Sequence, residues 1–349
     1  MIVKNEAHCI SKCLESVKPH ISSWVICDTG STDNTEEVVR KTLKGIPGEF
    51  HKNEWEDFAT NRNISLELAR KKLSKKGCGY ILFIDADDQL VVEDKLIFNQ
   101  LINPIYRFKI HHGPIIYNRI ELVRHDIPAK YVGVCHEYLD ILHEHDGPIL
   151  DGCYIKFGGV GARSQDPQKY LKDASLFEKA LLKEPKNDRY VFYCGQSYRD
   201  AGIRDKAMEM YLRRGMMGGW IEEQYVAYLE AGKIAFELNR DKVDSIMLMA
   251  QNCHPGRNEA LCYLAAFNRE LKNWHKAYFY AKIGSKIQKP VDGLFLEVGC
   301  YDYKIFDELS IAAFYIGKTQ EAKQLMNLLI CKDIPKDQKE RIRANLKFL

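Results

Sequence analysis

The apolar positions in the first half of the chain predict alternating strands and helices. Short apolar runs at residues 2–3, 24–27 and 80–84 have the length of buried strands. Between them, residues 6–17 and 55–72 carry apolar side chains near a 3.6-residue period, which is typical of helices. This alternation predicts a mostly parallel sheet with helices on both faces, and shorter strand-like segments follow that could pair antiparallel at the sheet edge.

The pattern changes after a glycine-rich break between residues 158 and 167. From Lys169 onward nearly every segment has helical periodicity, so the chain reads as α/β followed by all-α. One segment fits the 34-residue tetratricopeptide pattern at Gly195, Tyr198, Gly202, Ala207 and Tyr211. The matching alanines of two later hairpins, Ala277 and Ala322, follow at irregular spacings. We expect an α/β domain over residues 1–160 and stacked helical hairpins over residues 166–349, with a generic helical bundle as the alternative for the second part.

Composition limits the classes of function. The 51 basic and 48 acidic side chains nearly balance, so the sequence carries no electrostatic signal for a nucleic-acid partner. No apolar run approaches the roughly 18–20 residues that cross a bilayer, which predicts no transmembrane segment. The first residues do not resemble a signal peptide. Because the 11 cysteines are scattered without zinc spacing, we expect free thiols and a cytoplasmic location.

Acidic residues follow the third buried strand directly. Asp85-Ala86-Asp87-Asp88 begins where residues 80–84 end, and ligands of open α/β sheets bind at this end of the strands. Carboxylates crowded at a strand end repel each other unless a cation or a hydrogen-bond donor is present. Carboxylate oxygens suit Mn²⁺ or Mg²⁺, which usually also hold substrate phosphates. The alternative is a solvated turn with aspartates that cap a helix.

A second strand ends in the same way. Asp28 follows residues 24–27, and its carboxylate could accept hydrogen bonds from a ribose or a nucleobase. Gly30, two residues later, lets the backbone approach a ligand closely. The alternative is that Asp28 only shapes its turn through an Asx-type hydrogen bond.

Three further residues are candidates for chemistry. His136 and Glu137 follow a strand-like segment, where His136 could complete a metal site and Glu137 could act as general base. Neighbouring residues of an extended chain point to opposite faces, so both can reach one site only if the backbone turns there. Arg119 could bind diphosphate oxygens in a bidentate manner. For all three the alternative is an ordinary solvated side chain.

Four segments in order resemble the motifs of family 2 glycosyltransferases. They are residues 1–6 (MIVKNE), 28–35 (DTGSTDNT), 61–63 (NRN) and 85–88 (DADD). The resemblance covers roughly residues 1–160, and the helical tail is similar to that of a subgroup with a tetratricopeptide-like domain after the catalytic one. It implies the GT-A fold, a Rossmann-like α/β domain.

The resemblance also implies roles for single residues. It implies that the nucleoside or nucleotide is contacted by Val3, Asn5, Glu6, Asp28 and Arg62. Asp85 would bind the ribose or help to hold the metal, and Asp87 would coordinate the metal that bridges the two phosphates of the donor. The subgroup also has a His-Glu pair at the place of His136 and Glu137.

We therefore predict metal-dependent transfer of a sugar from a UDP- or GDP-sugar to a glycan, protein or other acceptor, with the inversion that the resemblance implies. Stacked hairpins form concave surfaces, so the helical domain is expected to select the acceptor or to mediate homo-oligomerisation. One alternative is a non-catalytic scaffold with a relic α/β domain. Another is sugar-nucleotide synthesis, which normally shows a basic, glycine-rich phosphate loop where this chain has residues 4–8 (KNEAH).

Overall fold

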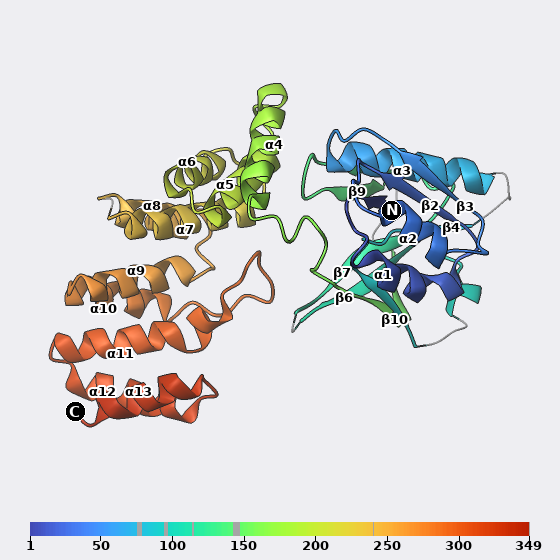
Figure 1. Ribbon diagram of the computed structural model, residues 1–349. Coiled ribbons are helices and arrows are strands. Elements are labelled where there is room, and N and C mark those ends of the chain that lie inside the picture. Colours follow the sequence, from blue (N-terminus) through green and yellow to red (C-terminus); the bar gives the residue numbers. More distant parts are fainter. Residues whose placement is uncertain (75–78, 94–96, 114, 142–146, 240, 349) are drawn as a thin grey trace. The chain divides into compact units, whose positions relative to one another are not determined.

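The computed structural model describes residues 1–74, 79–93, 97–113, 115–141, 147–239 and 241–348. The chain forms two compact units, Met1–Leu176 and Phe177–Leu349 (Figure 1). Within the described ranges no helix is long and apolar enough to cross a membrane. Each cysteine among these residues is a free thiol, as the sequence predicted. His143-Glu144-His145 has the spacing of metal ligands in the sequence but lacks a third ligand, and it lies outside the described residues.

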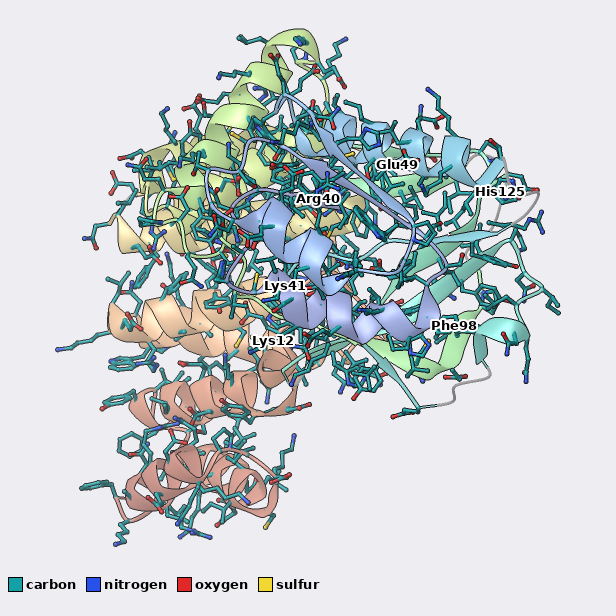
Figure 2. All side chains as sticks on the ribbon, turned by 45° about the vertical axis from the view of Figure 1, so that its right-hand side comes forward. Lys12, Arg40, Lys41, Glu49, Phe98 and His125 are labelled. Carbon is teal, nitrogen blue, oxygen red and sulfur yellow. The ribbon has the colours of Figure 1, made fainter. Side chains whose placement is uncertain are left out.

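Three parallel strands open the first unit, in the order β1-β2-β3. They are β1 (Ile2–Val3), β2 (Trp24–Asp28) and β3 (Gly48–Lys52). The segments between and after them form α1 (Ile10–Val17), the short helix η1 (Lys18–His20), α2 (Thr35–Thr42) and α3 (Phe58–Ser74). Apolar residues of α1 and α2 pack against Val3 and Ile26 of the sheet. The charged side chains Lys12, Arg40 and Lys41 lie on the exposed faces of these two helices (Figure 2).

Five further strands form a mixed sheet in the order β4-β7-β6-β10-β5. They are β4 (Tyr80–Leu82), β5 (Gln89–Val92), β6 (Ile105–His112), β7 (Ile115–Arg124) and β10 (Ile149–Lys156), and the short helix η2 (Ile97–Asn99) precedes β6. Only β6 and β10 are parallel; the other three pairs are antiparallel. Phe108, Ile110 and Ile155 are fully buried in its core.

The N-terminal unit therefore has the mixed α/β class that the sequence predicted, but the expected mostly parallel sheet ends after β3. The physical reason is the short connection between β6 and β7. Two residues can join antiparallel neighbours, whereas parallel strands need a crossover of a dozen residues or more. The strands β6 and β7 pair antiparallel as expected, but both lie inside the sheet and not at its edge, and β6 also pairs parallel with β10.

A separate hairpin lies against α3. Its strands are β8 (Ala129–Val132) and β9 (Tyr138–Ile141). Asn63 of α3 fixes this hairpin because its side chain donates to the Tyr131 carbonyl at 2.9 Å and accepts from the Tyr131 N–H at 2.7 Å. The turn between β8 and β9 is thereby held beside the preceding residue of α3, Arg62.

The second unit is a stack of helical hairpins (Figure 1). After α4 (Lys169–Lys183), which starts in the first unit, the helices are α5 (Asp188–Asp200), α6 (Arg204–Gly215), α7 (Ile221–Glu237), α8 (Val243–Cys253), α9 (Glu259–Glu270), α10 (Trp274–Gly284), η3 (Cys300–Lys304), α11 (Ile305–Tyr315), α12 (Thr319–Cys331) and α13 (Lys336–Leu346). The small residues Ala207, Ala277 and Ala322 are fully buried. Gly202 has φ 78°, which suits the turn between α5 and α6.

A fully buried arginine connects α7 and α9. The Arg257 guanidinium donates to Glu259 Oε1 and to Glu222 Oε2, both at 2.6 Å, and to the Leu294 carbonyl at 2.9 Å. Arg257 and Glu259 are both inaccessible to solvent. Two buried charges of this kind are tolerated only while they remain paired.

Replacing Arg257 by alanine is expected to lower the free energy of unfolding by about 3–5 kcal/mol, because Glu259 would stay buried without a cationic partner. Urea unfolding of the full chain, followed by far-UV circular dichroism, measures the change. The control is Arg204→Ala, which removes the exposed pair between Arg204 and Glu237 and should change stability by about 1 kcal/mol or less. Equal losses in the two variants would contradict the importance of the buried network.

Candidate active site

Asp85, which follows β4 after Phe83 and Ile84, lies between two arginines. Arg62 Nη2 donates to Asp85 Oδ1 at 2.7 Å, and Arg119 Nη1 lies 3.8 Å from Asp85 Oδ2. Burial alone would raise the pKa of Asp85, but the guanidinium groups of Arg62 and Arg119 outweigh it and lower the pKa to about 2. Asp85 is therefore an anchored anion at neutral pH.

The NRN motif explains how Arg62 reaches this position. Asn61 is buried and holds the chain before α3, accepting from the Glu56 N–H at 3.0 Å and donating to the Glu54 carbonyl at 2.9 Å. Asn63 holds the β8–β9 hairpin, as described above. Because its two neighbours are fixed, the Arg62 side chain is held between Asp85 and Glu137. Its Nε donates to Glu137 at 2.5 Å.

Glu121 is part of the site although the sequence reasoning missed it. Residues two apart on a strand share a face, so Glu121 stands beside Arg119 on β7 and accepts a hydrogen bond from Arg119 Nε. Glu121 is 2% exposed, and burial raises its pKa to about 7 despite the neighbouring guanidinium. The i, i+2 spacing of an arginine and a glutamate on a predicted strand was the signal that could have found it.

Asp87 and Asp88 hold a glycine-rich segment, residues 158–162, here called the 158–162 loop. Asp87 Oδ2 accepts from the N–H groups of Val160 at 3.0 Å and Gly161 at 2.9 Å. Asp88 Oδ1 accepts from the Gly158 N–H at 3.1 Å. A Cβ atom on Gly158 would lie 1.8 Å from the Asp87 carbonyl oxygen, so only glycine fits there. From the sequence alone, the glycines of this segment predict only a break between domains.

Val3, Asn5 and Asp28 meet in the turn after β2. Val3 pairs with Asp28 in the parallel sheet, and Asn5 Oδ1 accepts from the Thr32 N–H at 2.7 Å. The Asp28 carboxylate accepts from the Gly30 and Ser31 N–H groups at 3.1 and 2.8 Å, which is the Asx-type arrangement that the sequence left open as the alternative. A shallow pocket opens beside this turn, lined by residues 28–31 and 52–54.

Glu6 joins this turn to the 158–162 loop. Its N–H donates to Thr35 Oγ1 at 2.9 Å, and its carboxylate accepts from the Ala162 N–H at 3.2 Å. A Cβ atom on Gly161 would lie 3.2 Å from Asp87 Oδ2 and 3.4 Å from Glu6 Oε1. The carboxylates of Glu6 and Asp87 therefore face the same glycine. Glu6, predicted to contact the nucleoside, thus lies beside Asp87, predicted to bind the metal.

The backbone does turn at His136, where φ is 51°. Glu137 reaches Arg62, whereas His136 is exposed, with ligand atoms of Cys135 and Asp173 within 4.8 Å. Arg163 donates to both Cys135 and Asp173, which places a cation in that group. Among the described residues, neither cluster of three or more possible metal ligands, Glu6-His8-Cys9 or Cys135-His136-Asp173, includes Asp85 or Asp87.

The donor atoms around Asp87 fit a hard divalent cation. Asp87 accepts its two hydrogen bonds at Oδ2, so its Oδ1 could bind a cation. Asp88 Oδ2 is buried without a hydrogen-bond partner, although Arg119 Nη2 lies 3.5 Å away. Burial and the charge of Asp85 raise the pKa of Asp88 to about 6. A cation would supply the positive charge that these oxygens lack.

In this unit carboxylates follow the ends of strands, and two arginines and a glycine-rich loop pair with them. These features are typical of α/β domains that bind ligands at the ends of their strands. Residues 1–96 match the model of the family described as "Glycosyl transferase family 2". The N-terminal part of the chain is therefore a family 2 glycosyltransferase domain, and a tetratricopeptide-like helical region follows it, as the sequence predicted.

The similar proteins include a glycosyltransferase and a protein with tetratricopeptide repeats. The SPbeta prophage-derived glycosyltransferase SunS of Bacillus subtilis (strain 168) is 25% identical over 231 residues, which cover 62% of this chain and 52% of SunS. A TPR repeat-containing protein of Synechococcus elongatus is 28% identical over 148 residues, 40% of this chain and 34% of that protein. The chain thus spans about half the length of SunS. A crystal structure of MamA aligns with a TM-score of 0.39 at 16% identity, over 54% of this chain and 99% of MamA.

Glu121 is expected to make stability depend on pH. Its carboxyl titrates near 4.5 in the unfolded chain and near 7 in the folded one, so the folded state loses stability as the pH rises between these values. Glu121→Gln still accepts from Arg119 but cannot ionise. The free energy of unfolding of the wild type should therefore fall relative to Glu121→Gln between about pH 5 and pH 8, as measured by urea unfolding at each pH.

The control for this prediction is Glu67→Gln, because the Glu67 side chain is 58% exposed. Its difference from the wild type should stay nearly constant over the same pH range. A constant difference for Glu121→Gln as well would show that Glu121 keeps an ordinary pKa.

Proposed function

We propose that this chain transfers a sugar from a UDP- or GDP-sugar to an acceptor, with a divalent cation and with inversion at the anomeric carbon. One observation carries the proposal: the hydrogen bonds of Glu6 and Asp87 to the 158–162 loop connect the turn at Asp28 to the carboxylates after β4. A nucleoside diphosphate needs such a continuous set of partners, from its base and ribose to its two phosphates.

The nucleoside end of the donor is assigned to the turn after β2. Asn5 and Asp28 shape this turn, and the shallow pocket beside it includes Lys52 and Asn53. Polar side chains and backbone groups of this kind can hydrogen-bond to a ribose or a nucleobase. Val3 supports the turn from the neighbouring strand, since its carbonyl accepts from the Thr29 N–H at 2.9 Å.

The diphosphate end is assigned to Asp87 and the arginines. Mn²⁺ or Mg²⁺ held by Asp87 would neutralise the charge that the nucleoside diphosphate gains as the sugar leaves. Asp85 would first have to give up Arg62 to bind a cation, and His136 would have to turn away from Cys135 and Asp173, so Asp87 is the principal ligand that we propose. Arg119 stands next to Asp85, where it can bind a phosphate oxygen.

Glu137 is assigned to the acceptor. In the proposed step an acceptor oxygen forms a bond to the anomeric carbon, the bond from that carbon to the diphosphate oxygen breaks, and Glu137 takes the proton of the acceptor hydroxyl. The hydrogen bond from Arg62 fixes one oxygen of Glu137 and leaves the other for this proton. The helical unit is proposed to select the acceptor, which is a glycan, a protein or a small molecule.

Asp87→Asn is expected to reduce cation-dependent hydrolysis of UDP- or GDP-sugars by about a hundredfold or more, because charge stabilisation by a catalytic cation contributes several kcal/mol. The measurement is release of UDP or GDP with and without added Mn²⁺. Asp151→Asn is the matched control, since the Asp151 side chain is 80% exposed. Near-normal, Mn²⁺-dependent release by Asp87→Asn would remove Asp87 as the ligand.

Glu137→Gln is expected to bind UDP or GDP with Mn²⁺ normally and to transfer sugar about 10²–10⁴ times more slowly, the usual contribution of a general base. Calorimetric titration measures binding, and product formation with a panel of acceptors measures transfer. Glu67→Gln again serves as the control. Retained transfer would exclude Glu137 as the base, whereas lost binding would show that it acts only by holding Arg62.

A further inference from the structure

Four backbone N–H groups of the 158–162 loop point at carboxylates. Gly158 donates to Asp88, Val160 and Gly161 donate to Asp87, and Ala162 donates to Glu6, at 2.9–3.2 Å. The loop is also held at the Val160 carbonyl, which lies 2.8 Å from His8 Nε2. A short run of backbone therefore presents nearly all its donors to anionic oxygens.

The glycines of the loop make this arrangement possible. Gly159 has φ 67°, in the left-handed region, and Gly158 approaches the Asp87 backbone too closely for any side chain. Successive N–H groups in such turns form concave sites for anions, and phosphate is a frequent occupant. Here the occupants are the carboxylates of the protein itself.

The basic residue next to the loop is used elsewhere. Arg163 donates to Asp173 and to Cys135, and its guanidinium lies 4.1 Å from the centre of the Phe58 ring. The loop itself contains only glycine, valine and alanine. Within the loop itself, an anion can therefore be bound only by backbone amides.

We propose that the 158–162 loop is a subsite for the donor diphosphate, formed when its amides pass from Asp87 to phosphate oxygens. This inference rests on the proposed function. A divalent cation held by Asp87 would weaken its oxygens as hydrogen-bond acceptors. The N–H of Gly161, a buried residue, would then need another acceptor, because an unsatisfied buried N–H is unfavourable. The exposed N–H of Val160 would be open to the same phosphate oxygens, which such a cation also binds.

The exchange is directly testable on the wild-type protein by NMR with ¹⁵N-labelled glycine and valine. The probes are Mg²⁺ alone, and then Mg²⁺ with inorganic pyrophosphate. The amide resonances of Val160 and Gly161 are expected to shift further, in a saturable manner, when pyrophosphate is added. Resonances that stay unchanged at saturating pyrophosphate would overturn the subsite, because Asp87 would then keep both amides.

A pair of variants measures the size of the effect. Val160→Pro removes one N–H, and Val160→Ala keeps it while changing the same exposed side chain. In calorimetric titration the proline variant is expected to bind pyrophosphate with Mg²⁺ about tenfold more weakly than the alanine variant, as for loss of a hydrogen bond to a charged group. Equal affinities would overturn the proposal. Should Val160→Pro fail to fold, the NMR result decides alone.

Failure of this inference differs from failure of the proposed function. A wild type that hydrolyses nucleotide sugars while its loop amides ignore pyrophosphate would refute only the subsite. A wild type that binds neither UDP nor GDP under any condition with Mn²⁺ or Mg²⁺ would refute both.

Discussion

The pairing of Asp85 with two arginines is the interaction on which the candidate site depends. It joins α3 through Arg62, β7 through Arg119 and, through Arg62 again, the β8–β9 turn at Glu137. These elements belong to separate parts of the fold. Without the carboxylate of Asp85, Arg62 and Arg119 would lose the partner that they share, and each would be left with its own carboxylate, Glu137 or Glu121.

Two arginines are nevertheless too few for the carboxylates around them. Asp85, Asp88, Glu121 and Glu137 all lie within 4 Å of one guanidinium or the other. The raised pKa values of Asp88 and Glu121 are the physical result, because protonation removes part of the excess negative charge. Asp87 adds another carboxylate at the edge of this group. A site with such an excess favours a cation, and this electrostatic balance is independent of any comparison with other proteins.

The sequence predicted those parts of the site that depend on local patterns. A buried strand followed by acidic residues is visible in one segment, which is why the sequence alone suggests Asp28, Asp85 and Asp87 as candidates. Gly158 could not be identified in this way, because its position depends on how β10 pairs with β5, and antiparallel register is not written in any single segment. The turn at His136 could not be predicted either, because a non-glycine residue with positive φ has no reliable sequence signal.

The helical unit also contains a feature that the sequence alone does not predict. Ala277 and Ala322 are 45 residues apart, 11 more than a 34-residue repeat, and from sequence alone this reads as decay of the repeat. The additional residues lie between α10 and α11, and this connection is bound firmly. Lys233 Nζ and Tyr263 Oη donate to Glu297 at 2.6 and 2.8 Å, and the Leu294 N–H donates to Glu222 at 3.0 Å. Because its partners come from α7 and α9, the insertion is a built part of the stack and not a lost repeat.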